Sequence, residues 1–301
     1  MSTPHRGALR SRVIELARRE RLPGFRSKRA ISHFIGELAG ALRTQRVFEG
    51  ARFKGSPDVT AQDFHPYVAV RGVAIGDIEE ALWLTFLTTA CGALGKPGRW
   101  TTVRALYGGL GDGVWSWPRV SADPNAFRGW MVEHQTAVKA LKFGNHRKYE
   151  THDPHKQKST ADVVESYVRW VEKEGGGSQA AIFAKALDGR SAEDAFDVLY
   201  HTIRGVRRFG RTAKFDWLCL IGNLRLFAIR PGRCHLKGAS GPLAGAQKLF
   251  GRLSLGKLEQ RSAMLATTLG VPVEAVEDTL CNWQKSRGRP KGWLTISGCG
   301  S

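Results

Sequence analysis

The chain of 301 residues is poor in acidic residues and has no long apolar stretch. Asp and Glu total 27 against 46 Lys and Arg, which gives a formal net charge of +19. No segment reaches the roughly 18 consecutive apolar residues of a membrane span, and the basic N-terminal stretch lacks the apolar core of a secretory signal. Such a charge excess is typical of proteins that bind polyanions, most often nucleic acid. We therefore expect a cytoplasmic protein with a nucleic-acid partner and no membrane association.

Cysteine is also scarce. Five cysteines stand far apart, and no CxxC pattern occurs. This spacing argues against a zinc ribbon or a disulfide framework and is typical of reduced thiols. Cys219 lies in an apolar run, so we interpret it as a packing residue rather than a nucleophile.

Strand-like alternation is rare, and residues 67–73 are the only modest case. Apolar residues instead recur with helical spacing, so the fold class is predicted to be mainly α. Helices are predicted over 32–47, 76–92, 160–174, 191–204, 215–226, 242–250, 256–269 and 273–284. The helix over 76–92 is apolar on most sides, which predicts a central buried position. Between residues 92 and 130 we predict irregular, glycine-rich connections.

Two regions are predicted along the chain. Residues 1–129 form a mostly helical region with glycine- and tryptophan-rich loops, and residues 130–301 carry the densest clusters of functional side chains. The two regions are compatible with one continuous domain. The GGGS run at 175–178 is the best linker candidate, with a short helix-to-helix loop as the alternative.

The segment 141–157, LKFGNHRKYETHDPHKQ, is dense in functional side chains. Six follow one another without interruption: Asn145, His146, Arg147, Lys148, Tyr149 and Glu150. Three histidines also fall here, but HxxxH and HExxH spacings are absent, and the neighbouring lysines would repel a cation. Of the three interpretations, a solvated loop, a metal site and a polyanion contact, the charge favours the last. We expect no dedicated metal site.

A second basic cluster precedes the apolar helix that begins near residue 215. It contains Arg204, Arg207, Arg208, Arg211 and Lys214. Such a cluster neutralises several phosphates or a pyrophosphate leaving group. Asp216 is the only acid between Asp197 and Glu259. It is either paired with one of these arginines or poised as a base.

Three further segments each have a functional and a structural interpretation. In HLKGASGPLAGAQKLFG (235–251), the glycines either offer backbone amides to a DNA phosphate or form an ordinary turn. In CNWQKSRGRPKGW (281–293), cations interleaved with Trp283 and Trp293 indicate a nucleic-acid groove or a solvated tail. The tryptophans of 100–118 either wedge into a duplex or pack beneath the loop.

Four of these stretches, FGNHRKYETH, STADVVESYVRWV, FDWLCLIGNL and LKGASGPLAGAQKLFG, occur in a characteristic order. In that order the chain resembles the phage amino acid:DNA transferases, relatives of the α-glutamyl/putrescinyl thymine pyrophosphorylases. The resemblance covers about residues 130 to 255. It implies a DNA-glycosylase-like helical fold with a helix-hairpin-helix-type element, in an enzyme that works in the cytoplasm of a phage-infected host.

The activity that the resemblance implies is displacement of pyrophosphate from 5-pyrophosphomethyl-deoxyuridine in double-stranded phage DNA. The displacing nucleophile is a free amino acid, with glycine or serine favoured, and the enzyme acts downstream of a hydroxymethyluracil DNA kinase. No cofactor is firmly implied, although Mg²⁺ is compatible with a pyrophosphate leaving group. The alternatives are a DNA glycosylase or lyase for modified pyrimidines and a non-catalytic DNA-binding protein. The missing acid after the hairpin disfavours the glycosylase.

The resemblance also suggests roles for residues. The catalytic candidates are His146, Glu150, Lys214 and Asp216. The candidates for binding pyrophosphate or substrate are Asn145, Arg147, Lys148, Tyr149 and Arg211. The DNA-binding candidates are Gly238, Gly241, Gly245, Lys248, Lys285, Arg287 and Arg289.

Overall fold

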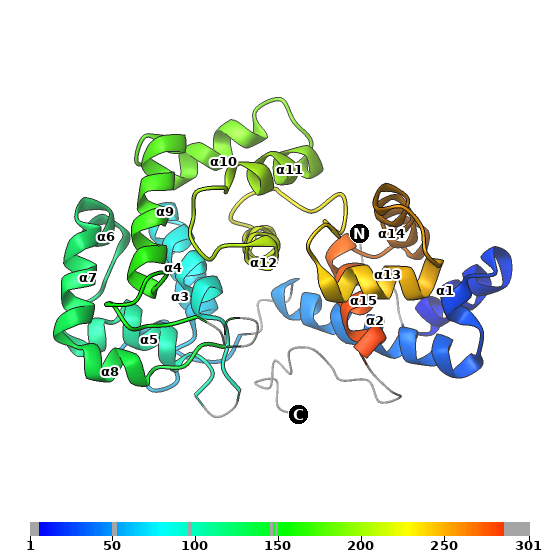
Figure 1. Ribbon diagram of the computed structural model, residues 1–301, viewed down its shortest axis with the longest axis horizontal. Helices are drawn as coiled ribbons and strands as arrows, with labels where there is room; N and C mark the ends of the chain where they lie inside the picture. Colours follow the sequence, from blue (N-terminus) through cyan, green and yellow to red (C-terminus); the bar gives the residue numbers. More distant parts are fainter. Residues whose placement is uncertain (1–5, 50–52, 96–97, 145–146, 148–149, 286–301) are drawn as a thin grey trace. The chain divides into compact units, whose positions relative to one another are not determined.

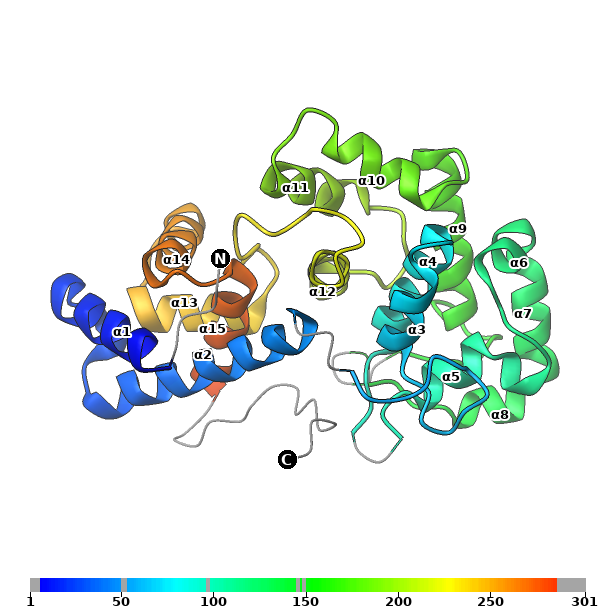
Figure 2. The same cartoon turned by 180° about the vertical axis from the view of Figure 1, so that it is seen from behind.

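The structure is a computed structural model that describes residues 6–49, 53–95, 98–144, 147 and 150–285. In these residues it contains fifteen α-helices, two short 3₁₀ helices and no strand, which confirms the mainly α fold class. The chain divides into two compact units (Figures 1 and 2). Unit 1 combines residues 1–52 with 231–301, and unit 2 comprises residues 53–230. The boundary predicted near residue 130 falls inside unit 2.

Unit 1 joins the two ends of the chain. Its N-terminal elements are α1 (Arg6–Glu20), η1 (Pro23–Phe25) and α2 (Lys28–Glu49), and its C-terminal elements are α13 (Ser240–Phe250), α14 (Leu255–Leu269) and α15 (Val273–Lys285). Helix α15 packs on both α13 and α2, so the last helix holds the first part of the chain in place (Figure 1). No local sequence pattern shows such an association of distant segments.

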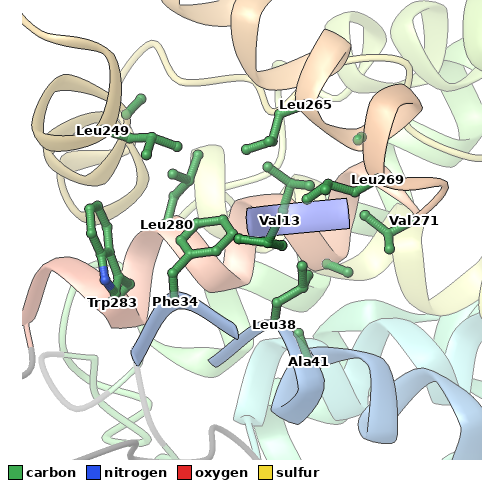
Figure 3. Packing of buried hydrophobic residues seen from close by; sticks show 14 of the residues in the cluster. Val13, Phe34, Leu38, Ala41, Leu249, Leu265, Leu269, Val271, Leu280 and Trp283 are labelled. Atoms are coloured by element: carbon green, nitrogen blue, oxygen red, sulfur yellow. The ribbon is translucent and has the colours of Figure 1, made fainter. Parts of the chain in front are cut away.

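The core of unit 1 forms where these helices meet (Figure 3). Trp283 is only 1% exposed, and its ring lies edge-on to Phe34 with 5.6 Å between the centroids. Its indole N–H donates to the carbonyl of Ala30 at 3.2 Å. Trp283 is therefore a core residue and cannot stack on a nucleic-acid base.

Helices α13 and α15 approach each other closely because α13 carries glycine at the contact. A Cβ on Gly245 would lie 2.1 Å from the carbonyl oxygen of Leu280, and one on Gly241 would lie 2.6 Å from Cys281 Sγ. Both distances are far below van der Waals contact. These two glycines thus have a packing role that the sequence alone did not reveal.

Unit 2 contains ten helices within its described residues. They are α3 (Pro66–Val73), α4 (Ile78–Cys91), α5 (Thr101–Tyr107), α6 (Trp117–Ala122), α7 (Pro124–Glu133), α8 (Gln135–Ala140), α9 (Thr160–Gly175), α10 (Gln179–Leu187), α11 (Ala192–Thr202) and α12 (Arg211–Asn223). The 3₁₀ helix η2 (Gly109–Gly111) follows α5. Helix α4 contacts α3, α5, α10 and α12, and nearly all of its residues are buried. This confirms the predicted central helix.

Aromatic rings fill the core of unit 2. Phe86 stacks on Tyr167 with 3.6 Å between centroids, and Trp217 lies edge-on to both rings. Trp115 and Trp117 are 2% and 5% exposed, and the buried Glu80 accepts hydrogen bonds from Tyr107 and from the backbone N–H of Trp117. The tryptophans of the 100–118 segment are therefore packing residues, and the wedge interpretation is wrong for them.

Two local predictions also require correction. Residues 67–73, predicted as the one strand-like segment, form helix α3, because Pro66 occupies a first-turn position and the His65 side chain accepts from the backbone N–H of Tyr67. Residues 92–130, predicted as irregular, contain the short helices α5, α6 and most of α7. The GGGS run is a short turn between α9 and α10, with Gly176 in the left-handed conformation that ends α9.

Candidate functional site: a cation-lined groove beside a buried glutamate

The candidate site lies on unit 2, where the 141–160 segment meets the arginine-rich loop before α12. The first segment is anchored by the backbone N–H of Gly144, which donates to the carbonyl of Cys91 at 2.9 Å. A Cβ on Gly144 would lie 2.4 Å from the carbonyl oxygen of Ala93, so only glycine allows this approach. The end of α4 thereby fixes the position of the residues that follow.

Two residues of the predicted six-residue motif belong to the described residues, and they form an ion pair. Arg147 Nη1 lies 3.6 Å from Glu150 Oε1, and both side chains are largely buried. The Arg147 guanidinium also lies 5.9 Å from the centroid of Phe209, in the loop before α12. The other four candidates, Asn145, His146, Lys148 and Tyr149, lie outside the described residues.

Burial raises the pKa of Glu150, while Arg147 and Arg208 oppose that shift. The carboxyl is thus held near cations without being strongly acidified, as a group that takes up a proton must be. Burial also raises the pKa of the neighbouring Cys91 thiol, and Glu150 adds to the effect. Cys91 is therefore protonated at neutral pH and is not a nucleophile.

His152 is a structural residue beneath this segment. Its ring stacks on Phe143 with 3.8 Å between centroids, and Nδ1 lies 2.8 Å from Thr160 Oγ1. Burial lowers the pKa of His152 to about 4, so the ring is neutral at physiological pH. It holds the segment against the start of α9.

An acidic pair at the start of α9 organises the adjacent cations. Asp162 accepts from Arg128 Nη2 at 2.5 Å and from the backbone N–H of Lys158, and Arg207 Nη1 lies 3.3 Å from it. Arg128 Nε donates to Glu165 at 2.5 Å. Burial works to raise the pKa of Asp162, but the bonds from Arg128 and Lys158 outweigh it and hold that pKa below its usual range. Asp162 is thus a carboxylate that orients its partners.

Around this pair the structure forms a groove of about 710 Å³. Its lining residues are Arg128, Pro154, His155, Lys156, Gln157, Lys158, Asp162, Arg207 and Arg208. Five of these are Lys or Arg, and the single acid is already engaged by three donors. The groove also lies at the N-terminus of the 16-residue helix α9, whose dipole favours an anion. A phosphate-bearing group is the ligand that such a lining fits best.

Backbone strain occurs at two of the cations that line the groove. Lys158 and Arg208 both adopt left-handed conformations, with φ of 61° and 58°. Residues with a side chain rarely adopt such angles, and strained positions of this kind are enriched at functional sites. Arg208 lines the groove, and its positive charge also acts to lower the pKa of Glu150. The buried glutamate is therefore close enough to the groove to interact with one of its cations.

The candidate residues of α12, which are Arg211, Lys214 and Asp216, do not lie on one side of the helix. Lys214 lies 5.7 Å from the ring centroid of Tyr200, and burial, together with Arg204, lowers its pKa. Asp216 is two positions further on, points to nearly the opposite side of the helix and is exposed. There its carboxylate adds to the effect of burial in raising the pKa of Tyr67 to about 12. Arg211 lies over the ring of Phe215 at 4.6 Å.

The DNA-binding candidates lie in unit 1. Of the three glycines, Gly238 alone is exposed, with φ of 78°. Lys248 Nζ donates to the carbonyl of Trp283 at 3.3 Å, and Lys285 Nζ donates to Cys281 Sγ at 3.0 Å. Arg287 and Arg289 lie outside the described residues.

Sequence reasoning missed Arg128, Asp162 and Glu165. A signal was present for Asp162, because Ser159 caps α9 and an acid in the first turn of a helix after a cap indicates an ordered N-terminus. Nothing in the sequence connects Arg128 to it, since the two lie 34 residues apart.

Two kinds of feature, a metal-holding cluster and a membrane-spanning helix, are not found within the described part of the chain. No three side chains of His, Cys, Asp or Glu gather into a metal-holding group there, and His146 lies outside the described residues. No described helix combines the length and the apolar character that crossing a membrane requires.

Together these features define a helical protein with a groove lined by Lys and Arg next to a buried carboxyl group. The family model of the α-glutamyl/putrescinyl thymine pyrophosphorylases, clade 3, matches residues 45–292, and the chain belongs to this family. The match extends well beyond residues 130–255 and includes all of unit 2. No curated protein and no solved structure shows a significant match. By its family the protein is a thymine hypermodification enzyme of pyrophosphorylase type.

Proposed function

We propose that the protein displaces pyrophosphate from 5-pyrophosphomethyl-deoxyuridine in double-stranded phage DNA, using a free amino acid as the nucleophile. The observation that carries this proposal is the groove of five cations beside Glu150. Membership in the family supports a reaction that involves thymine and pyrophosphate. We propose that the pyrophosphate binds in the groove. Glycine and serine remain the favoured amino acids.

The groove acts on the leaving group. As the bond between the methylene carbon and the pyrophosphate oxygen breaks, the bonding electrons and the negative charge move onto the pyrophosphate. Preoriented cations stabilise that charge more in the transition state than in the ground state. Arg128 and Arg207 are held for this purpose by Asp162. Lys156, Lys158 and Arg208 complete the cationic lining.

Glu150 acts as the base. The amino group attacks the methylene carbon, a carbon–nitrogen bond forms, and the proton that the nitrogen loses passes to the Glu150 carboxylate. A carboxyl whose pKa is raised by burial is a stronger base than an exposed one. With serine, its hydroxyl is a second nucleophile of the same kind. His146 is the competing candidate for this role and lies outside the described residues.

The roles that the sequence suggests for Arg211, Lys214 and Asp216, in catalysis or pyrophosphate binding, remain proposals. Because Lys214 and Asp216 lie on opposite sides of α12, at most one of them acts in the same site as Glu150. We place Lys214 with the arginines, since Arg204 contributes to its pKa shift. If Mg²⁺ takes part, we expect it to arrive with the pyrophosphate.

The reaction needs a kinase to prepare its substrate, and we infer that the protein acts after a hydroxymethyluracil DNA kinase in the host cytoplasm. The test is to incubate the protein with pyrophosphorylated duplex and isotopically labelled glycine or serine, then to analyse nucleosides by mass spectrometry. We expect release of pyrophosphate and a labelled nucleoside with the mass of the amino acid adduct. Abasic sites without an adduct would instead identify a glycosylase, and an unchanged duplex that the protein still binds would indicate a non-catalytic DNA-binding protein.

A further inference from the structure

Positive charge is divided unevenly between the two units. Unit 1 has 22 Lys and Arg against 8 acids, and unit 2 has 24 against 19. Unit 1 is the smaller unit, yet it carries a net charge of +14 out of +19. The proposed catalytic groove lies in unit 2. Most of the charge of the protein is therefore placed where the proposed chemistry does not use it.

Two stretches without any acid carry nine of the 22 Lys and Arg of unit 1, four in the first and five in the part of the second that belongs to unit 1. No Asp or Glu occurs between Glu20 and Glu37, or between Asp216 and Glu259. From these stretches we define the basic cluster of unit 1 as Arg21, Arg26, Lys28, Arg29, Lys248 and Arg252. All six are exposed.

Packing brings the two stretches together. The turn that contains η1 lies against the end of α13, where a Cβ on Gly24 would be 2.7 Å from Leu249 Cα and 2.8 Å from the carbonyl oxygen of Lys248. Trp283 lies beneath both stretches, since it donates to Ala30 and accepts from Lys248 through its own carbonyl. Figure 3 shows Trp283 beside Phe34 and Leu249. Both stretches of the cluster therefore pack on the hydrophobic core around Trp283.

The charge of the cluster is not compensated. Within the described part of the chain, no ion pair engages any of its six members, whereas two of the groove cations of unit 2, Arg128 and Arg207, are paired with Asp162 or Glu165. The Lys248 ammonium lies over the Trp283 ring, 4.3 Å from its centroid. Unpaired, exposed cations on a fixed surface are what a polyanion backbone binds.

We propose that the basic cluster of unit 1 binds the phosphate backbone of duplex DNA, independently of the modified base. An anionic membrane is the rival partner, but membrane-surface binding needs exposed apolar side chains beside the cations. The exposed large apolar residues found in the described part are Ile75, Leu110, Val114, Leu255 and Met264. Only Leu255 lies near the cluster in the sequence, three residues after Arg252, and a single apolar side chain gives little area for membrane insertion.

This inference goes beyond the proposed reaction. It assigns a second surface, four of whose members precede residue 45, where the family match begins. It requires no pyrophosphate, no amino acid and no catalysis, so it is testable on unmodified DNA. A failure of the transferase proposal would leave it intact.

The experiment uses the full chain and an unmodified duplex. Binding is measured by fluorescence anisotropy across a salt series for the wild type and for the triple variant R26Q/K28Q/R29Q. The control is K54Q/K173Q/K185Q, which removes three exposed lysines of unit 2. Each lost phosphate contact reduces the slope of log K against log salt by about 0.9. We expect the triple variant to reduce the slope by about 2 to 3 and the control to leave it close to that of the wild type.

Equal slopes for the wild type and the triple variant would overturn the proposal, as would an equal loss in the control. A second variant, R21Q/R252Q, samples both stretches of the cluster, and circular dichroism melts establish that each variant is folded. Vesicles of phosphatidylcholine and phosphatidylserine form the last arm. If the triple variant lost vesicle binding but kept its salt slope on DNA, the cluster would be a membrane surface.

Discussion

Glu150 combines burial with two neighbouring cations, and this combination gives the proposed base a testable pH dependence. A base must be deprotonated, so the rate falls as pH drops through its pKa. Because burial raises the pKa of Glu150, that fall should occur at a higher pH than for an exposed glutamate. We expect E150Q to lose this limb of the pH profile and to react about a hundredfold or more slowly.

The control for E150Q is E172Q, which removes an exposed carboxylate of α9. It should keep the wild-type rate and pH profile in the same pyrophosphate-release assay. If E150Q retained both, the base would have to be another group, and His146 would be the next candidate.

Gly245 gives a prediction about stability that is independent of function. In G245A the new methyl would clash with the backbone of Leu280, because its Cβ would lie only 2.1 Å from the Leu280 carbonyl oxygen. We expect a loss of about 1–3 kcal/mol in the free energy of unfolding, as for other overpacked contacts. The control is G129A in the interior of α7, where nothing lies within 4 Å and alanine should stabilise the helix by roughly 0.5–1 kcal/mol. Urea denaturation of both variants checks the two signs, and destabilisation by both would contradict the packing account.

Single residues differ in how far their surroundings could be predicted. Arg147 and Glu150 stood out because they are neighbours in a dense polar segment, and they do form a pair. The glycines of α13 were assigned to DNA, yet Gly241 and Gly245 are required by a helix contact. Their true partner, α15, lies more than 30 residues away, and a local pattern cannot specify it.

At the scale of elements, the start of α9 organises the groove. In D162N the amide keeps the shape of the side chain but loses its negative charge, so Arg128 and Arg207 are no longer held by a carboxylate. We expect weaker binding of the pyrophosphorylated duplex and slower pyrophosphate release, with unchanged binding of unmodified duplex. Anisotropy with the two duplexes separates these effects, and equal losses on both would indicate a general defect.

D162N also tests how the ionisation of Asp162 makes the free energy of unfolding depend on pH. The pKa of Asp162 is depressed, so its contribution to stability is present above the pKa of the unfolded chain, about 3.9, and is lost as pH falls through the lower folded value. The stability difference between wild type and D162N should therefore be largest near neutral pH and should shrink below about pH 4. Thermal melts across this range measure it, and a difference that grew toward acid would contradict the assignment.

Helices with strong apolar periodicity and caps were predictable, whereas short ones were not. The segments 76–92 and 160–174 had caps, and the structure ends both near the predicted residues. The segment 92–130 was predicted as irregular because α5 and α6 have only 7 and 6 residues, too few for a periodic signal. Their stability comes from burying Trp115 and Trp117 and from Glu80, which are tertiary effects.

On the scale of the whole molecule, the division into two units does not follow the order of the sequence, because unit 1 contains segments from both ends of the chain. The motifs predict two regions that meet near residue 130. Unit 1 is the strongly basic unit, and the groove belongs to unit 2. The DNA-glycosylase-like fold and the helix-hairpin-helix element stay predictions.

The central claim is that the groove of unit 2 stabilises a pyrophosphate leaving group. Its most direct test is the rate of pyrophosphate release from pyrophosphorylated duplex, at saturating glycine or serine, for the wild type, K156A/R208A and the charge-matched control K54A/K185A. We predict that K156A/R208A reduces the rate at least about a hundredfold while the control retains it. Release at the wild-type rate by K156A/R208A would contradict the account.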